Sequence, residues 1–213
     1  MGEALAGGGD LGRPQADAGV TVKPLLLVST SPQRRAILEQ LRIPFEVEAP
    51  RYVEHDPPGL DPLALVRAHA LGKACSLADR SQGRPLLGVD TAVVLEGEMY
   101  GKPGDAEEAA TMLTRLAGKT HEVISGLCLL GEGWQELEHS STLVTFRTLT
   151  GMEIERYVAS DEWRGRAGAY AIQGLGAALA ERIQGDYLNV VGLPGGLLVA
   201  LLAKRFPGCY GLG

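Results

Sequence analysis

Paired cysteines, surplus positive charge and long apolar runs are all missing from this sequence. Its three cysteines, Cys75, Cys128 and Cys209, are widely spaced and form no C-x-x-C motif, so they indicate neither a zinc site nor a redox pair. Such usage favours a reducing, cytoplasmic setting. The most apolar stretch, residues 190–203, is interrupted by glycines and a proline and is too short to span a bilayer. We therefore expect no contact with a membrane.

Positive charge is scarce, because 20 Lys and Arg residues stand against 26 Asp and Glu residues, for a net charge of −6. Binding to a nucleic acid backbone is driven by clustered Lys and Arg, so this balance argues against a nucleic acid partner. The fractions of hydrophobic residues (45%) and charged residues (22%) are those of an ordinary globular protein. The 29 glycines follow no repeat and indicate many tight loops.

Several familiar catalytic motifs are missing as well. There is no H-E-x-x-H and no G-x-S-x-G. Residues 97–103 are one residue short of a P-loop and lack its Ser or Thr, and the G-x-G at 174–176 precedes no evident helix. Four histidines show no metal spacing and are expected at the surface or as helix caps: His55, His69, His121 and His139.

Strand and helix signals alternate along the chain. An apolar run at residues 25–28 predicts a buried strand, and the Ser-Pro pair at 31–32 predicts the start of a helix. The Asp-Pro pair at 61–62 repeats this signal, and a second buried strand at 86–89 is expected to end at Asp90. The pattern predicts an α/β fold, with one domain in which helices flank a mixed, largely buried sheet.

The second half of the chain continues the pattern, with strands expected at 121–130 and 143–148. The first 23 residues lack the basic start and apolar run of a secretory signal. We expect a flexible N-terminal tail at 1–23, one folded domain at 24–206 and a short C-terminal tail at 207–213.

The turn from Ser29 to Arg35 combines three hydroxyls, a helix N-terminus and two arginines. Each of these groups favours an anion, since helix N-termini offer backbone N–H donors and guanidinium groups match phosphate oxygens. The turn therefore predicts a phosphate site. The alternative is an ordinary capped helix with two solvated arginines.

Asp90 follows a buried strand, with Glu96 and Glu98 close behind it on a predicted hairpin. Ligands of open α/β sheets bind beyond the carboxyl ends of strands, so Asp90 is a candidate general base or metal ligand. Carboxylates beside a phosphate site suit Mg²⁺ or Mn²⁺. Asp90 could instead merely cap a turn.

The loop at residues 164–176 is rich in small residues, which allow close approach of the backbone. Gln173 lies within it, and its amide can donate to and accept from a base or carbonyl edge. A purely structural turn is the alternative.

Taken together, these segments resemble the Maf family of nucleoside triphosphate pyrophosphatases. The resemblance runs from Pro24 to Leu202 and rests on six motifs in order: S-T-S-P-Q-R-R, G-V-D-T, E-G-E-M-Y-G-K-P, F-R-T-L-T, A-G-A-Y-A-I-Q-G and V-V-G-L-P. It implies a fold similar to the Maf and inosine triphosphatase proteins, with a central cleft. It also implies cytoplasmic hydrolysis of nucleoside triphosphates, between the α- and β-phosphates, with a divalent metal.

The resemblance also implies roles for single residues. Asp90 matches the general base, and Glu54 the acidic residue that helps to bind the metal, with Asp90 beside it. The remaining candidates are expected to bind substrate: Ser29, Ser31, Gln33, Arg34, Lys73, Thr91, Lys102 and Gln173. A homodimer is compatible with this assignment.

The choice of substrate stays open between two branches of the family. Thr91 and Gln173 are similar to the branch that prefers dTTP and UTP, whereas the S-T-S-P-x-R-R spelling is similar to the branch that acts on 7-methyl-GTP. Gln33 matches neither branch, and residues 165–166 read Gly-Arg where the family usually has Asp-Lys. The two matching selectivity positions favour dTTP, UTP or modified nucleotides of this type, and 7-methyl-GTP or a broad range of triphosphates is the alternative within the family. A nucleotide-binding regulator of cell division with slow turnover is the alternative outside this reaction.

Overall fold

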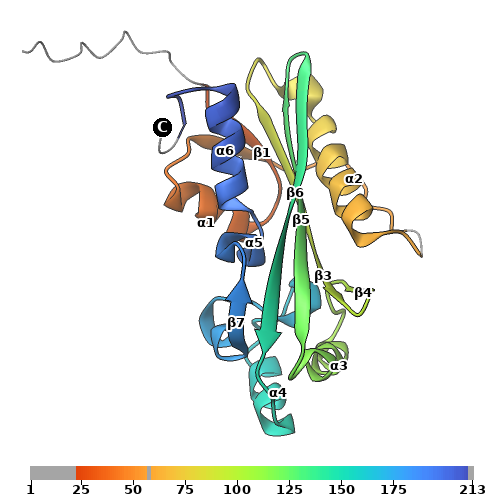
Figure 1. The fold of residues 1–213 in the computed structure, drawn as a ribbon. Coiled ribbons are helices and arrows are strands. Elements are labelled where there is room, and N and C mark those ends of the chain that lie inside the picture. Colours follow the sequence, from red (N-terminus) through yellow and green to blue (C-terminus); the bar gives the residue numbers. More distant parts are fainter. Residues whose placement is uncertain (1–22, 57–58, 211–213) are drawn as a thin grey trace, which may run out of the picture.

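Within the part of the chain that the structure describes, seven strands form one mixed sheet in the order β2-β1-β3-β5-β6-β7, with the short β4 paired to β3 (Figure 1). The computed structural model describes residues 23–56 and 59–210, so nearly all of the expected N-terminal tail lies outside the described residues. The strands are β1 (Leu25–Val28), β2 (Phe45–Glu48), β3 (Leu86–Leu95), β4 (Glu98–Tyr100), β5 (Thr120–Gly131), β6 (Trp134–Phe146) and β7 (Ala180–Gln184).

Helices cover both faces of this sheet. The α-helices are α1 (Pro32–Gln40), α2 (Pro62–Cys75), α3 (Ala106–Leu116), α4 (Gly151–Val158), α5 (Tyr187–Val191) and α6 (Gly195–Arg205). Three short 3₁₀ helices are η1 (Ala78–Arg80), η2 (Ala167–Ala169) and η3 (Gly174–Ala178). No helix of the described residues is both long and apolar enough to cross a membrane.

The helix starts follow the predicted capping signals. Ser31 caps α1 and accepts a hydrogen bond from the backbone of Arg34, while Asp61 caps α2 and accepts one from Ala64. In both helices a proline holds the first position, where its missing N–H costs nothing. Both predicted helices are confirmed.

The sheet changes from parallel to antiparallel pairing at β3. β1 runs parallel to β2 and β3, but its pairing with β3 is confined to the start of that strand, at Leu86 and Leu87. β3 then continues antiparallel to β5 as far as Val94. The prediction that this strand ends at Asp90 is wrong, because the backbone of Asp90 stays paired with Gly126 of β5. Asp90 nevertheless lies beyond the carboxyl end of the neighbouring parallel strand β1.

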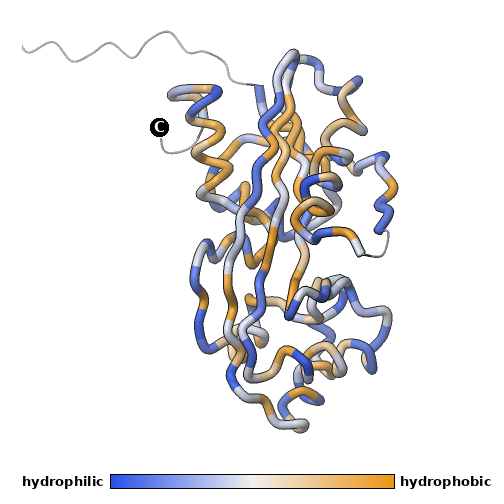
Figure 2. Tube along the Cα trace, turned by 45° about the vertical axis from the view of Figure 1, so that its right-hand side comes forward, coloured by the Kyte–Doolittle hydropathy of each residue, from blue (hydrophilic) through white to orange (hydrophobic). Residues whose placement is uncertain are grey.

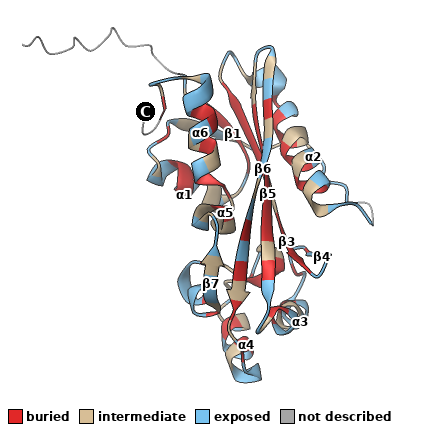
Figure 3. Ribbon diagram, viewed as in Figure 1, coloured by how far each residue is buried: buried red, intermediate tan, exposed pale blue. Residues whose placement is uncertain are grey.

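The hydrophobic core consists of separate clusters on the two faces of the sheet and at one end of it. α1, α5 and α6 cover one face of the upper half in Figure 1, and α2 covers the other, while α3 and α4 lie at the lower end. Separate clusters of buried side chains lie under α1 and α6, under α2 and at the lower end. β1 and the first half of β3 are buried on both faces and strongly hydrophobic (Figures 2 and 3). The predicted α/β domain with a largely buried mixed sheet is confirmed.

Two glycines bring α2 unusually close to the sheet. A Cβ on Gly88 of β3 would lie 2.1 Å from the carbonyl oxygen of Ala70, and one on Gly126 of β5 would lie 2.3 Å from that of Val66. Only glycine fits under the helix at these two positions. The short separation places Lys73, near the end of α2, directly over β3.

Some elements were not recognised in the sequence. β6 begins at Trp134, whereas the predicted strand begins at residue 143. The first half of β6 carries Glu136, Glu138 and a Ser-Ser pair, and this polar sequence did not indicate a strand. β7 and α6 were not predicted either. Tyr210, within the expected C-terminal tail, is buried against the cluster under α6.

Candidate active site

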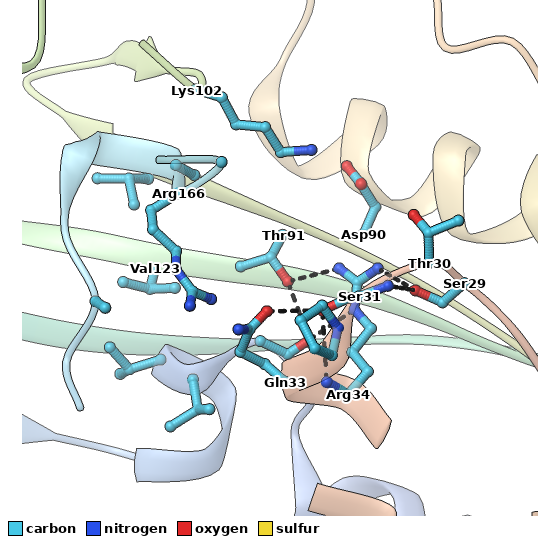
Figure 4. A pocket seen from close by; sticks show the side chains of 18 of the residues that line it. Ser29, Thr30, Ser31, Gln33, Arg34, Asp90, Thr91, Lys102, Val123 and Arg166 are labelled. Atoms are coloured by element: carbon cyan, nitrogen blue, oxygen red, sulfur yellow. Dashed lines mark hydrogen bonds between the residues drawn. The ribbon is translucent and has the colours of Figure 1, made fainter. Parts of the chain in front are cut away.

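One cavity of about 320 Å³ lies at the junction of α1, the middle of β3 and the loop after α4. This volume is in the range of small-molecule sites. The cavity is lined by all ten residues singled out in the sequence: Ser29, Ser31, Gln33, Arg34, Glu54, Lys73, Asp90, Thr91, Lys102 and Gln173. Several of them are labelled in Figure 4. Arg35, which belonged to the predicted phosphate turn, is exposed and does not line the cavity.

A lysine between two carboxylates forms one wall of the cavity. The Nζ atom of Lys73 lies 2.6 Å from Oε1 of Glu54 and 2.6 Å from Oδ1 of Asp90. Lys73 is buried, with a side chain 8% exposed, and the two carboxylates compensate its charge inside the protein. Asp90 Oδ2 accepts no hydrogen bond from the described residues, which leaves this oxygen free to take a proton.

The charges of this wall lower the pKa of Glu54. Burial raises the pKa of the Glu54 carboxyl, but the hydrogen bond and charge of Lys73, together with the charge of Lys102, outweigh burial and leave the pKa below its usual range. Glu54 is therefore an anion at neutral pH, and its ion pair with Lys73 favours this charged form.

Arg34 is fixed by uncharged oxygens at the opposite wall. Its Nε donates to the carbonyl of Gly192 at 2.9 Å, and its two terminal nitrogens donate to Ser29 at 3.3 Å and to Thr91 at 3.4 Å (Figure 4). Burial lowers the pKa of the Arg34 guanidinium, an effect opposed by the charges of Asp90 and Glu54. The guanidinium stays charged because its ordinary pKa is so high. It is thus a rigid cation without a carboxylate bound to it.

The turn before α1 presents a mixture of donors. The hydroxyl of Ser31 donates to Oε1 of Gln33 at 3.1 Å, and the hydroxyl of Ser29 accepts from the backbone of Ser31. The amide nitrogen of Gln33 has no hydrogen-bond acceptor among the described residues. Gln33 therefore offers a neutral donor to the cavity beside the helix N-terminus.

Two further cations reach the cavity without a partner. Within the described ranges, neither Lys102 nor Arg166 makes an ion pair or a side-chain hydrogen bond, and both point into the cavity in Figure 4. The Nε atom of Arg166 is buried with no hydrogen-bond partner. Such a group carries a desolvation penalty that an anionic ligand would relieve. With Arg34, this gives three cations that form no ion pair with a carboxylate of the described residues.

Comparison with known proteins shows the family of this chain. The family model for Maf-like proteins matches residues 24–205. The chain belongs to the Maf-like protein family. A protein named dTTP/UTP pyrophosphatase from Nitratidesulfovibrio vulgaris is 46% identical over 184 residues, which cover 85% of this chain and 88% of that protein.

Other relatives of this Maf-like protein carry the same name. The dTTP/UTP pyrophosphatase of Gloeobacter violaceus is 45% identical over 84% of this chain and 95% of its own length. That of Symbiobacterium thermophilum is 44% identical over 81% and 89%. Among solved structures, the Ham1 protein of Staphylococcus aureus aligns with 86% of this chain and 100% of its own at 12% identity, with a TM-score of 0.42. This likeness is weak.

The donor set of the Maf-like protein fits a magnesium or manganese ion. Among the described residues no group of three His, Cys, Asp or Glu side chains converges on one point, but Glu54 and Asp90 are brought together by Lys73, which contacts both. Mg²⁺ is usually held by one or two carboxylates together with substrate phosphates and water. Two carboxylates beside three free cations are therefore consistent with a metal that arrives with a triphosphate.

Two residues at or behind the cavity of this Maf-like protein were not recognised as such in the sequence. Arg166 was treated as a departure from the family pattern, not as a cavity residue. Ser125, fully buried, lies behind Thr91 with the two hydroxyl oxygens 2.8 Å apart. Ser125 had no sequence signal, because the strand register that places it behind Thr91 depends on long-range pairing.

The prediction that the histidines lie at the surface or cap helices is wrong for two of the four. His69 and His121 are 3% and 2% exposed. Each has a polar partner inside the protein: His69 contacts Tyr52 and Asp56, and Nε2 of His121 lies 2.8 Å from the hydroxyl of Tyr170, which lines the cavity. Burial lowers the pKa of His121 to about 4, so it is neutral at physiological pH.

Proposed function

We propose that this protein hydrolyses nucleoside triphosphates between the α- and β-phosphates, giving a nucleoside monophosphate and pyrophosphate, and that dTTP and UTP are its preferred substrates. The observation that carries the proposal is the cavity, where the carboxylate–lysine wall faces Arg34, Lys102 and Arg166. A triphosphate brings about four negative charges, and these three cations with the helix N-terminus match it. Relatives over 40% identical are named for this activity.

In this proposal Asp90 is the general base. Its free Oδ2 takes the proton of the attacking water, one P–O bond of the α–β bridge breaks, and a new P–O bond to the oxygen of water forms. A positioned base of this kind contributes about 10²–10⁴-fold to the rate. Lys73 holds the carboxylate in place through Oδ1 and adds positive charge where the transition state gains negative charge.

A divalent metal, Mg²⁺ or Mn²⁺, would be held by Glu54 and Asp90 and would neutralise charge on the phosphate oxygens. Arg34, Lys102 and Arg166 bind the remaining oxygens, and Ser29 and Ser31 shape the turn that receives them. Gln33, Thr91 and Gln173 contact the nucleoside or its nearest phosphate and select among bases. Gln173 is exposed at the cavity mouth, where an amide can meet the carbonyl and N–H edge of a pyrimidine.

The decisive experiment is product analysis with a panel of triphosphates. Purified protein is incubated with dTTP, UTP, CTP, GTP and 7-methyl-GTP in the presence of Mg²⁺ or Mn²⁺, and pyrophosphate and orthophosphate are measured separately. We expect equimolar monophosphate and pyrophosphate, fastest with dTTP and UTP. Release of orthophosphate alone would refute cleavage of the α–β bridge, preference for 7-methyl-GTP would move the chain to the other branch, and binding without turnover would favour a regulatory role.

We also propose that the protein is located in the cytoplasm. Separately, we propose that it forms a homodimer. The three cysteines are free thiols in the structure, which supports a reducing compartment. Size-exclusion chromatography with light scattering gives the oligomeric state directly, since the monomer has a mass of 22.5 kDa.

A further inference from the structure

One buried histidine holds the segment that carries Glu54 against α2. Residues 50–56 contain no helix or strand, and among the described residues they make no backbone–backbone hydrogen bond to another segment. His69 contacts this segment on both sides of Glu54. Its Nδ1 lies 3.0 Å from the hydroxyl of Tyr52, and its Nε2 lies 2.7 Å from Oδ1 of Asp56. Glu54 is midway between these two anchors in the sequence.

The histidine is itself rigidly placed. It lies on α2 four residues before Lys73, on the same side of the helix, and its side chain is only 4% exposed. The imidazole can satisfy both contacts at once, with Nδ1 as the acceptor for the phenol and the N–H at Nε2 as the donor to the carboxylate. Both anchors of the segment therefore rest on the helix that also carries Lys73.

The ring of Tyr52 packs closely against the same helix. Gly72 leaves a notch for the ring, because a Cβ at this position would lie 2.3 Å from Cε2 of Tyr52. The rings of Tyr52 and His69 meet edge to face, with centroids 5.6 Å apart. The ring position is thus fixed by packing as well as by its hydrogen bond.

We propose that His69 is a positioning residue for Glu54: by anchoring the residues two before and two after it, His69 holds the Glu54 carboxylate beside Lys73 and Asp90. This inference rests on the proposed function, in which Glu54 is a metal ligand. A ligand on a segment without backbone pairing must otherwise be ordered at the moment of binding, which weakens affinity. Partners that orient a metal ligand from behind change metal affinity by about 10–100-fold when removed.

The experiment measures Mn²⁺ binding to the full chain by electron paramagnetic resonance, with and without nucleotide, together with amide hydrogen exchange of residues 50–56. His69→Leu removes both anchors, while His69→Gln keeps a donor and an acceptor. Tyr52→Phe removes one hydroxyl. Its matched control is Tyr210→Phe, which removes the hydroxyl of a buried tyrosine, bonded to the carbonyl of Lys23 far from the cavity.

His69→Leu is expected to weaken Mn²⁺ binding about 10-fold and to speed exchange in residues 50–56. Tyr52→Phe should have a smaller effect in the same direction, His69→Gln should recover part of the affinity, and Tyr210→Phe should leave both measurements unchanged. If His69→Leu does not fold, the comparison of His69→Gln and Tyr52→Phe with Tyr210→Phe decides the question.

Two results would overturn the inference in different ways. Parental Mn²⁺ affinity in the His69 and Tyr52 variants, with weaker binding in Glu54→Gln, would remove the positioning role and leave the proposed metal site intact. Unchanged binding in Glu54→Gln, or no Mn²⁺ binding by the parent protein under either condition, would refute the metal site itself and the inference with it.

Discussion

Gly88 of β3 lies directly beneath Ala70 of α2, so that a Cβ on Gly88 would approach the Ala70 carbonyl oxygen to 2.1 Å. The contact fixes the height of α2 above the sheet. Since Lys73 lies on the next turn of the same helix, its reach to Asp90 depends on that height. A packing requirement in the core is thereby linked to the geometry of the cavity.

Gly88→Ala should therefore both destabilise the protein and impair the site. We expect the free energy of unfolding to fall by about 1–3 kcal/mol, as for other overpacked cores, with turnover reduced because Lys73 moves away from Asp90. Urea denaturation and steady-state kinetics measure the two effects. Gly151→Ala is the control, because nothing lies within 4 Å of a Cβ at that position in α4. Equal stability of the two variants would contradict the close approach of α2.

Asp90→Asn should abolish most of the turnover while substrate still binds. The amide cannot accept the proton of water, so kcat should fall by about 10²–10⁴-fold with little change in KM. Glu98→Gln is a matched control, since Glu98 follows on the same hairpin but pairs with Arg115 outside the cavity. Full activity in Asp90→Asn would rule out its role as the base.

Arg166→Met should weaken substrate binding. A charge-assisted hydrogen bond contributes about 1.5–3 kcal/mol, so we expect KM for dTTP to rise 10-fold or more. Arg166→Lys keeps the charge and should retain part of the affinity. Arg164→Met serves as the control, because Arg164 is exposed, stacks on Trp163 and pairs with Asp161. If the two methionine variants have the same KM, Arg166 does not touch the substrate.

His121 should make stability depend on pH in a defined window. The folded protein keeps this imidazole neutral down to about pH 4, whereas the unfolded chain takes up the proton near pH 6.5. Between these values the unfolded state binds more protons, so stability is complete above about pH 6.5 and falls as the pH approaches 4. The loss attributable to His121 is about 3 kcal/mol.

Urea denaturation at a series of pH values tests this dependence. His121→Gln keeps a hydrogen-bonding group for Tyr170 but does not titrate, so the stability of the parent should fall more steeply than that of the variant below pH 6.5. His139→Gln, at an exposed position, should follow the parent. Parallel curves for parent and His121→Gln would show that the pKa of His121 is not lowered in the folded protein.

Local signals in the sequence were enough to predict much of the fold. Ser31 and Asp61, each followed by proline, predicted both helix starts, because capping depends on neighbours within one turn. The polar first half of β6 was not predicted as a strand. Its pairing with β5 is decided by partners distant in the sequence and leaves many of its side chains facing solvent.

The site residues also divide into those that local sequence predicts and those that depend on the fold. Residues within the turn at 29–34 were identified from their own spacing, whereas Lys73 and Glu54 came from the family resemblance and meet Asp90 only in the fold. Arg166 and His69 were not predicted as site residues. What distinguishes them is their surroundings, a buried unpartnered Nε in one case and two anchors on a distant segment in the other, which no local pattern encodes.

The long hairpin of β5 and β6 bears on how a substrate can be enclosed. The two strands stay in unbroken register from Thr120 and Thr145 to Gly131 and Trp134, and β5 contributes to the core clusters of both halves of the molecule. A hinge rotation between the halves would have to bend or shear this continuous ladder. We therefore expect the hairpin to resist rotation of one half against the other, so that closure over a ligand would involve the side chains and loops at the rim of the cavity, residues 164–174 among them.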